Sequence, residues 1–340
     1  MNGIEGENFP VSKSFLCEAA LAQVIERAYG FTNVQCRLIQ ATMRDVYKVT
    51  SNSGTHVLFI YRHHQRTAEQ IEAEWNFIEY LHNCKVPVAP AIRQLNEQLL
   101  LTIPAPEGVR FAVLATFVAG EHLRKCYSAD AVRLYGRDVA QLHRHSDAMP
   151  PELAMQMQSR PINDFSLVVA RSLAAVAATV THRPEDVLYL QGVAELLRPL
   201  FEALPREQPF FGMIHGDVIR ANAQVDATGS VTLMDFDLCG PGWRAYDIAS
   251  FLEVIRYTPV QAEAETAFLC GYQEVRPLLR EEVAVLPLFG VARHFLVLGV
   301  PCMNAYHWGS VTLSDAAIDV ALAGIRHNMK LIEDQATLSQ

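Results

Sequence analysis

Carboxylate and amide side chains are grouped in one short segment of the second half of the chain. Asp217 lies in a polar loop between two short apolar runs, and Asn222 follows five residues later. Asp235 comes eighteen residues after Asp217, where an apolar run ends in Asp235, Phe236 and Asp237. A buried carboxylate without a positive partner is costly or becomes neutral. Because Mg²⁺ prefers hard oxygen ligands, the pattern predicts a magnesium site.

These groups match the few parts that phosphoryl transfer requires. One carboxylate accepts or orients the proton of the attacking hydroxyl, while a carboxylate and an amide oxygen hold the metal on the nucleotide phosphates. We therefore predict Asp217 as the catalytic carboxylate, and Asn222 and Asp235 as metal ligands. His215 is predicted to support catalysis by bracing the loop through hydrogen bonds rather than by transferring protons.

The order of these residues resembles that of the aminoglycoside phosphotransferase, choline kinase and type II homoserine kinase superfamily. The segment Gly240–Ala249, with Asp247 at the start of a helix, resembles the next segment of that superfamily. The resemblance implies an α+β, bilobal protein-kinase-like fold with ATP and Mg²⁺ as cofactors. It implies that Asp247 braces the metal loop, and it leaves Asp237 as either a metal ligand or a structural hydrogen-bond acceptor. The expected reaction moves the γ-phosphate of ATP to a hydroxyl of an amino alcohol, a homoserine-like or an aminoglycoside-like small molecule.

Sequence periodicity divides the chain of 340 residues into two parts, in agreement with about 150 residues per domain. Residues 1–118 alternate helical patterns with short β-like runs. They are predicted to form a nucleotide-binding lobe with an antiparallel sheet. Residues 119–340 are mostly helical in pattern and are predicted to carry the catalytic loop and the substrate cleft.

The expected phosphate-binding cation is missing from its usual position in the first lobe. Kinases of this shape carry a Lys or Arg on the third strand, paired with a Glu on the following helix. Phe59 stands there instead, and Glu74 is the predicted helix partner, since Glu72 points elsewhere on that helix. Either nucleotide binding is weakened or another cation substitutes. The candidates are Arg44, Lys48 and Arg62.

Two further nucleotide contacts follow from the resemblance. The turn that covers the phosphates is expected at Gln40–Asp45, which contains no glycine. The backbone from Thr116 to Val118 is expected to pair with the adenine edge.

Candidate substrate residues lie near the metal loop and in the C-terminal helices. Arg220 is expected to neutralise the transferred phosphate, to pair with Asp247 or to be solvated. For the others, helix packing is the competing interpretation, and Glu253 and Asp186 are acidic candidates by sign only. The remaining members of the set are Trp243, Tyr246, Arg293, His294, Asn304, Tyr306, His307 and Trp308.

The composition of the chain indicates which binding partners and which cellular location to expect. The net charge of −9 disfavours nucleic acid as a partner. Seven cysteines without a C-x-x-C motif indicate reduced thiols. No apolar run reaches the length of a membrane span, and residues 1–12 lack an apolar signal core. We expect a cytoplasmic monomer or homodimer that acts on a small molecule.

Two other functions remain open at this stage. A non-catalytic nucleotide-binding pseudokinase would agree with Phe59 in place of the strand cation. A protein Ser/Thr kinase of the same superfamily is the other alternative. About ten residues separate Asp235 from Tyr246, which is too short for a full activation segment.

Overall fold

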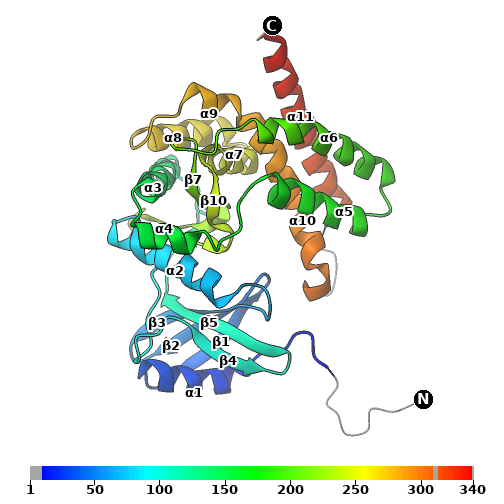
Figure 1. Ribbon diagram of the computed structural model, residues 1–340. Coiled ribbons are helices and arrows are strands. Elements are labelled where there is room, and N and C mark those ends of the chain that lie inside the picture. The colour runs from blue at the N-terminus through cyan, green and yellow to red at the C-terminus, as the bar shows by residue number, and fades with distance from the viewer. Residues whose placement is uncertain (1–9, 309–312, 339–340) are drawn as a thin grey trace, which may run out of the picture. The chain divides into compact units, whose positions relative to one another are not determined.

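The computed structural model describes residues 10–308 and 313–338 (Figure 1). The chain forms two compact units, residues 1–79 with 89–118 and residues 80–88 with 119–340. Most of the N-terminal segment used to predict the absence of a signal peptide lies outside the described residues. The α+β class and the antiparallel sheet of the first unit are confirmed.

The first unit contains one antiparallel sheet of five strands in the order β1-β2-β3-β5-β4 (Figure 1). Its register pairs Val46 of β2 with Phe59 of β3, and Phe59 with Val113 of β5. The bounds are β1 Gln35–Ala41, β2 Asp45–Ser51, β3 Gly54–Ile60, β4 Leu101–Ala105, β5 Gly108–Thr116, α1 Glu18–Tyr29 and α2 Ala68–Asn83.

The two faces of this sheet pack against different helices. Leu58 and Ile60 belong to the apolar cluster that includes Leu21 and Ile25 of α1. Since side chains alternate along a strand, Phe59 lies on the opposite face, where its ring contacts Trp75 of α2 at 5.6 Å between centroids. The α2 face therefore holds the position at which a kinase would carry its phosphate-binding cation.

The second unit is mainly helical, with two small sheets of strand order β10-β7 and β6-β8-β9. The strands are β6 Glu121–His122, β7 Phe211–Ile214, β8 Ala223–Val225, β9 Val231–Leu233 and β10 Gly240–Trp243. The helices are α3 Ala129–Asp147, α4 Pro151–Met157, α5 Arg171–Thr179, α6 Pro184–Glu202, α7 Arg244–Ile255, α8 Gln261–Gln273, α9 Arg280–Ala284, α10 Leu286–Trp308 and α11 Asp315–Leu338.

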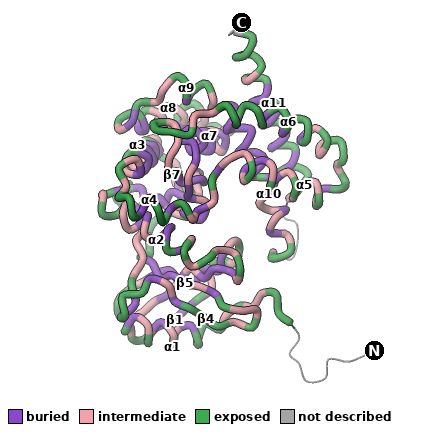
Figure 2. The backbone as a smooth tube through the Cα atoms, viewed as in Figure 1, coloured by how far each residue is buried: buried purple, intermediate pink, exposed green. Residues whose placement is uncertain are grey.

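Helix α10 is the central element of the second unit. Its apolar side chains join α5, α6, α7 and α11 in one large core cluster, and Figure 2 shows much of α7 and α10 as buried. Among the described helices, α10 alone has the length and hydropathy that a membrane span would need, and 67% of its apolar window is buried. These contacts make α10 a core helix of this fold.

A buried polar cluster fixes α10 against α7 and α11. Glu253 of α7 accepts hydrogen bonds from His294 at 2.8 Å, from Arg256 at 2.6 and 2.9 Å, and from Asn328 at 3.1 Å. Gly290 and Gly324 permit this approach, because an added Cβ would collide with the Glu253 and His294 side chains. Burial opposes the charge of Glu253, yet the bonds from His294 and Arg256 lower the pKa of Glu253 to about 2.

We expect Glu253→Gln to lower the free energy of unfolding by roughly 3 kcal/mol at neutral pH. The folded pKa of Glu253 lies below its ordinary value of 4.5, so its contribution is present above pH 4.5 and is lost as the pH falls towards 2. The difference from wild type should therefore shrink by about 1.4 kcal/mol per pH unit below 4.5. Urea denaturation at neutral and acid pH measures both quantities.

The matched control is Glu274→Gln, whose partner Arg133 is half-exposed. Exposed ion pairs contribute little, so this control should change stability by less than about 1 kcal/mol. A loss from Glu253→Gln that stays constant with pH would contradict an ionised, hydrogen-bonded Glu253.

Candidate active site

The loop of residues 215–222 runs from the end of β7 to the start of β8 and carries the predicted catalytic residues. Gly216 has a φ of 79°, in the left-handed region that favours glycine. A Cβ at this position would also collide with the carbonyl oxygen of Leu238. The glycine therefore lets the catalytic loop lie directly against the loop that follows β9.

Asp217 and Asn222 are joined within this loop. The amide nitrogen of Asn222 donates to Oδ2 of Asp217 at 2.7 Å and to the Asp217 carbonyl at 3.0 Å. Because the nitrogen faces Asp217, the amide oxygen of Asn222 faces away from it and can serve as a hard ligand. The side chain of Asp217 is 21% exposed, which leaves it accessible to a substrate hydroxyl.

Asp247, at the start of α7, holds the first turn of the loop. Its carboxylate accepts the backbone N–H groups of His215 and Gly216, each at 2.8 Å, and Nε2–H of His143 at 3.0 Å. Burial raises the pKa of Asp247 to about 6, against the opposing effect of these donors. These hydrogen bonds let Asp247 brace the loop, which is the role that the family resemblance implies.

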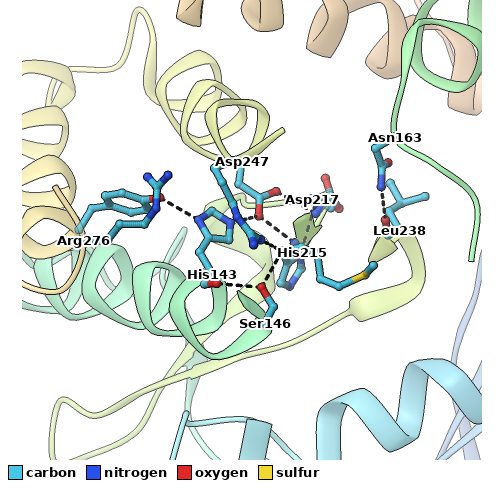
Figure 3. Close-up of polar contacts among 12 residues, drawn as sticks. His143, Ser146, Asn163, His215, Asp217, Leu238, Asp247 and Arg276 are labelled. Carbon is cyan, nitrogen blue, oxygen red and sulfur yellow. Dashed lines mark hydrogen bonds and ion pairs between the residues drawn. The ribbon is translucent and has the colours of Figure 1, made fainter. Parts of the chain in front are cut away.

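A buried chain of hydrogen bonds extends this brace away from the loop (Figure 3). Tyr272 of α8 bonds His143 at 2.8 Å, and Arg276 donates to the Tyr272 hydroxyl at 3.1 Å. Burial lowers the pKa of His143 well below its usual value, so the ring is neutral. With Nε2–H on Asp247, Nδ1 must accept the Tyr272 proton. Each donor direction is thus fixed from Arg276 to the catalytic loop.

The sequence analysis did not identify His143. A signal was present, because helical spacing places His143 of α3 on the same face as Val132 and Val139, which are buried. A histidine on the apolar face of a helix needs a polar partner. The partners Tyr272 and Asp247 lie more than 100 residues further along the chain, so spacing alone does not reveal them.

His215 has the bracing role that its position predicts. Nε2 donates to the carbonyl of Met234 at 3.0 Å, and Nδ1 accepts the N–H of Asp217 at 3.3 Å. Burial lowers the pKa of His215, and its ring packs on Phe236. Both ring nitrogens are used within the loop, so the arrangement suits positioning rather than proton transfer.

The loop after β9 carries Asp235 and Asp237 and is clamped from outside. Asp235 has left-handed backbone angles, with φ 63° and ψ 69°, which a nonglycine residue adopts only when its surroundings enforce it. Arg160 donates to the carbonyls of Asp237 at 2.6 Å and Cys239 at 3.0 Å, and Asn163 donates to that of Leu238 at 3.1 Å. Neither clamp residue had a recognisable signal in the sequence.

The donor set fits a magnesium ion that is bound together with a nucleotide. Within the described part of the chain, no group of three or more His, Cys, Asp or Glu side chains could hold a metal alone. Mg²⁺ usually combines one or two carboxylates with substrate phosphates. Asn222 and Asp235 would supply protein ligands of such an ion, and Asp237 would be either a further ligand or a structural hydrogen-bond acceptor.

In the first unit, Arg44 occupies the place beside Phe59 that the missing cation would fill. The guanidinium stacks over the Phe59 ring at 4.3 Å, and Nη1 lies 3.3 Å from Oε1 of Glu74. Tyr61 joins them, accepting from Arg44 at 3.2 Å and donating to Glu74 at 3.1 Å. Arg44 and Glu74 are both buried, whereas Glu72 lies on the other face of α2, as expected.

The other two candidate cations lie elsewhere. Nε of Arg62 donates to the carbonyl of Met43 at 2.7 Å, so Arg62 braces the turn that carries Arg44. The ammonium of Lys48 lies 5.5 Å from the Phe117 ring. Arg44 is in direct contact with Glu74, the predicted helix partner. The N–H of Thr116 donates to the Pro90 carbonyl, so an adenine edge would have to use other backbone groups of the segment that ends at Val118.

The predicted substrate residues separate into two groups. Arg293 of α10 contacts Asp217 at 2.7 Å, and Tyr246 of α7 lies beside Arg293. Trp243 is buried in the core and donates to the Pro205 carbonyl, while Tyr306 is 76% exposed.

Several other substrate candidates have partners within the second unit. His294 bonds Glu253, and Asn304 donates to the Val300 carbonyl of its own helix. Both acidic candidates are paired three residues away in the sequence, Glu253 with Arg256 and Asp186 with Arg183. Asp247 takes its contacts from His143 and the loop backbone, so the suggested pair between Arg220 and Asp247 is absent from the described contacts.

The site geometry agrees with a comparison to known families. The model of the phosphotransferase enzyme family matches residues 36–282, which include the catalytic loop, Asp247 and the pair of Arg44 and Glu74. The chain belongs to the phosphotransferase enzyme family. This confirms the superfamily that the sequence motifs indicated.

Individual relatives of this phosphotransferase share both sequence and fold. An uncharacterized protein of Synechocystis sp. is 30% identical over 81% of this chain and 75% of its own length. A homoserine kinase of Chelativorans sp. is 25% identical over 83% of this chain and 82% of its own. The solved structure of a microcompartment-associated aminopropanol kinase has a TM-score of 0.73 at 22% identity, covering 94% of this chain and 98% of that one.

Proposed function

We propose that this phosphotransferase is a kinase that moves the γ-phosphate of ATP to a hydroxyl of a small molecule, with Mg²⁺ held by Asn222 and Asp235. The observation that carries the proposal is the 2.7 Å hydrogen bond from Asn222 to Asp217, which joins the metal-side amide to the catalytic carboxylate. The relative and the structural neighbour that are named for homoserine and aminopropanol support a small hydroxylated acceptor.

The reaction requires little movement of protein groups. The acceptor hydroxyl oxygen forms a bond to the γ-phosphorus, the bond from that phosphorus to the β-phosphate oxygen breaks, and ADP leaves with the electron pair. Asp217 takes the hydroxyl proton. The magnesium ion would supply charge stabilisation on the phosphates, while Asp247 and His215 keep the loop in place.

The loop after Asp237 argues against a protein kinase. A short helical turn, Phe236–Leu238, is followed at once by β10, and α7 begins at Arg244. A protein kinase needs an activation segment at this point. The phosphotransferase has no room for one, which favours a small-molecule acceptor.

The proposed function also includes a cellular location and a class of partner. We place the enzyme in the cytoplasm, because all seven cysteines are free and a kinase of this type depends on intracellular nucleotide. A small-molecule acceptor, with no nucleic-acid or membrane partner, agrees with the acidic surface charge.

Nucleotide binding provides the first test of this function. We expect ATP, at about 100 times its Kd, to stabilise the chain by roughly 2.7 kcal/mol when Mg²⁺ is present, and by less after the metal is removed with EDTA. Differential scanning fluorimetry with ATP, ADP and GTP measures the shift. Asp235→Asn should abolish the part of the ATP-induced stabilisation that depends on Mg²⁺ and retain the part that does not. No shift with any nucleotide would refute the proposed kinase.

A further inference from the structure

The two carboxylate oxygens of Asp217 contact different groups. Oδ2 accepts from Asn222, the amide on the metal side, at 2.7 Å. Oδ1 pairs with Nη1 of Arg293, also at 2.7 Å, and Arg293 belongs to α10 rather than to the catalytic loop. The guanidinium therefore lies beside the Asp217 oxygen that Asn222 does not hold. A positive charge at this place would face an acceptor rather than the metal-bound phosphates.

Arg293 has more donors than its observed partner can satisfy. The residue is 7% exposed, and its Nε is buried without a hydrogen-bond partner among the described residues. The Tyr246 hydroxyl beside it is buried and interacts with the Arg293 side chain. Arginine carries five N–H donors, and a buried charge with unused donors is costly. The guanidinium beside Asp217 therefore has donor capacity left for a hydrogen-bonding anion.

The rest of the fold holds this guanidinium in place. The next residue, His294, is bonded to Glu253, and Gly290 and Gly324 bring α7 and α11 close to α10. Arg293 also packs with Tyr246, so it is not a solvated side chain that can move away. A fixed, planar fork of N–H donors is suited to bind a carboxylate through two hydrogen bonds.

We propose that Arg293, with Tyr246, recognises a carboxylate on the acceptor, so that the substrate is a small hydroxy acid or hydroxy amino acid. This inference rests on the proposed kinase function and makes its acceptor class specific. Amino alcohols lack the anionic group, and a polycationic aminoglycoside would place like charge beside a buried guanidinium. The carboxylate would share Arg293 with Asp217 and place the hydroxyl at Oδ1.

A matched pair of acceptors tests the inference. L-Homoserine and 3-amino-1-propanol have the same hydroxyl and amine and differ in the carboxylate; L-serine and ethanolamine form a second pair. We expect wild type to favour the carboxylated member by about 10- to 100-fold in kcat/KM, as for a charge-assisted hydrogen bond. Coupled ADP release measures the ratio.

Variants of Arg293 distinguish recognition of the acceptor carboxylate from the contact that holds Asp217 in place. Arg293→Gln should reduce the ratio between the two acceptors to about 1, and Arg293→Lys should keep part of it, since the charge remains but the fork is lost. If the variant only removed the contact that holds Asp217, kcat/KM would fall equally for both acceptors and their ratio would not change. The control Arg326→Gln removes an exposed arginine of α11 that contacts Asp186 rather than Asp217, and it should leave the ratio unchanged within about twofold.

Three results would overturn the inference. Wild type could use the decarboxylated member as well or better, or Arg293→Gln could slow both members equally, which would assign Arg293 to Asp217 or to the transferred phosphoryl group. The third is a chain that shows the Mg²⁺-dependent nucleotide shift but phosphorylates no carboxylated acceptor of either pair. Absence of the nucleotide shift itself would instead refute the proposed kinase function.

Discussion

Asp217→Asn is expected to reduce kcat by about 10³-fold or more while nucleotide binding is retained. A positioned base contributes about 10²- to 10⁴-fold, and the amide also removes the charge that orients the acceptor hydroxyl. Asn preserves the size of the side chain, and the Mg²⁺-dependent thermal shift should remain because Asp217 is not a predicted metal ligand. ADP release with the best acceptor, together with the thermal shift, measures both effects.

The matched control for this variant is Asp226→Asn. Asp226 lies in the exposed turn between β8 and β9 of the same segment, where it accepts the backbone N–H groups of Thr228 and Ser230. It should leave kcat within about twofold of wild type. If Asp217→Asn retains more than a tenth of the wild-type rate, Asp217 is not the catalytic carboxylate, and the pseudokinase alternative gains support.

The catalytic loop was predictable from the sequence because its function depends on neighbours in the chain. Asp217, Asn222 and His215 lie within eight residues, and their mutual hydrogen bonds follow from one short loop between two strands. The brace by Asp247 was implied by the resemblance to the superfamily, which places this residue at the start of a helix after the metal loop. Local spacing thus contains most of the information about this part of the site.

The remaining contacts depend on packing between distant elements. The chain from Arg276 through Tyr272 to His143 joins the end of α8 to α3, and periodicity indicates only that the helical residues are buried. Arg293 was one of many polar residues in the C-terminal helices. Its contact with Asp217 joins α10 to the loop after β7, two segments that are more than 70 residues apart in the sequence.

The two acidic substrate candidates have local partners that are visible in the sequence. Glu253 and Asp186 each have an arginine three residues away, Arg256 and Arg183. In a helix, residues three or four apart are neighbours, so these carboxylates had local partners. Charge sign without this spacing is a poor guide to a binding site.

Arg44 is one of the three cations that the sequence offered in place of the missing strand cation. Arg44→Gln is expected to lower both the stability of the fold and the affinity for nucleotide. The guanidinium is paired with buried Glu74 and stacked on Phe59, so its removal takes one cation away from a buried carboxylate. Breaking a buried pair from one side costs about 3–5 kcal/mol. If Arg44 contacts the phosphates, ATP affinity should also fall by about 10- to 100-fold, as for a lost charge-assisted contact. Urea denaturation and isothermal titration with ATP and Mg²⁺ measure these changes.

The control is Arg93→Gln in the same unit. Arg93 also pairs with a glutamate, Glu79, at 2.7 Å, but both side chains are more than one-third exposed. An exposed pair contributes about 0–1 kcal/mol, so this variant should leave stability and ATP affinity nearly unchanged. A comparable loss from both variants would show that the Arg44 effect is not specific to the buried pair.

A relocation experiment separates the phosphate contact from stability alone. Phe59 stands where related kinases carry a Lys or Arg, on the face of β3 that packs with α2, and Glu74 lies on that helix. In the Phe59→Lys/Arg44→Gln double variant, the new ammonium can pair with Glu74 from the usual strand position. We expect ATP affinity to recover relative to Arg44→Gln. If stability recovers and affinity does not, Arg44 and Glu74 form a structural pair, and the phosphates are bound by another cation.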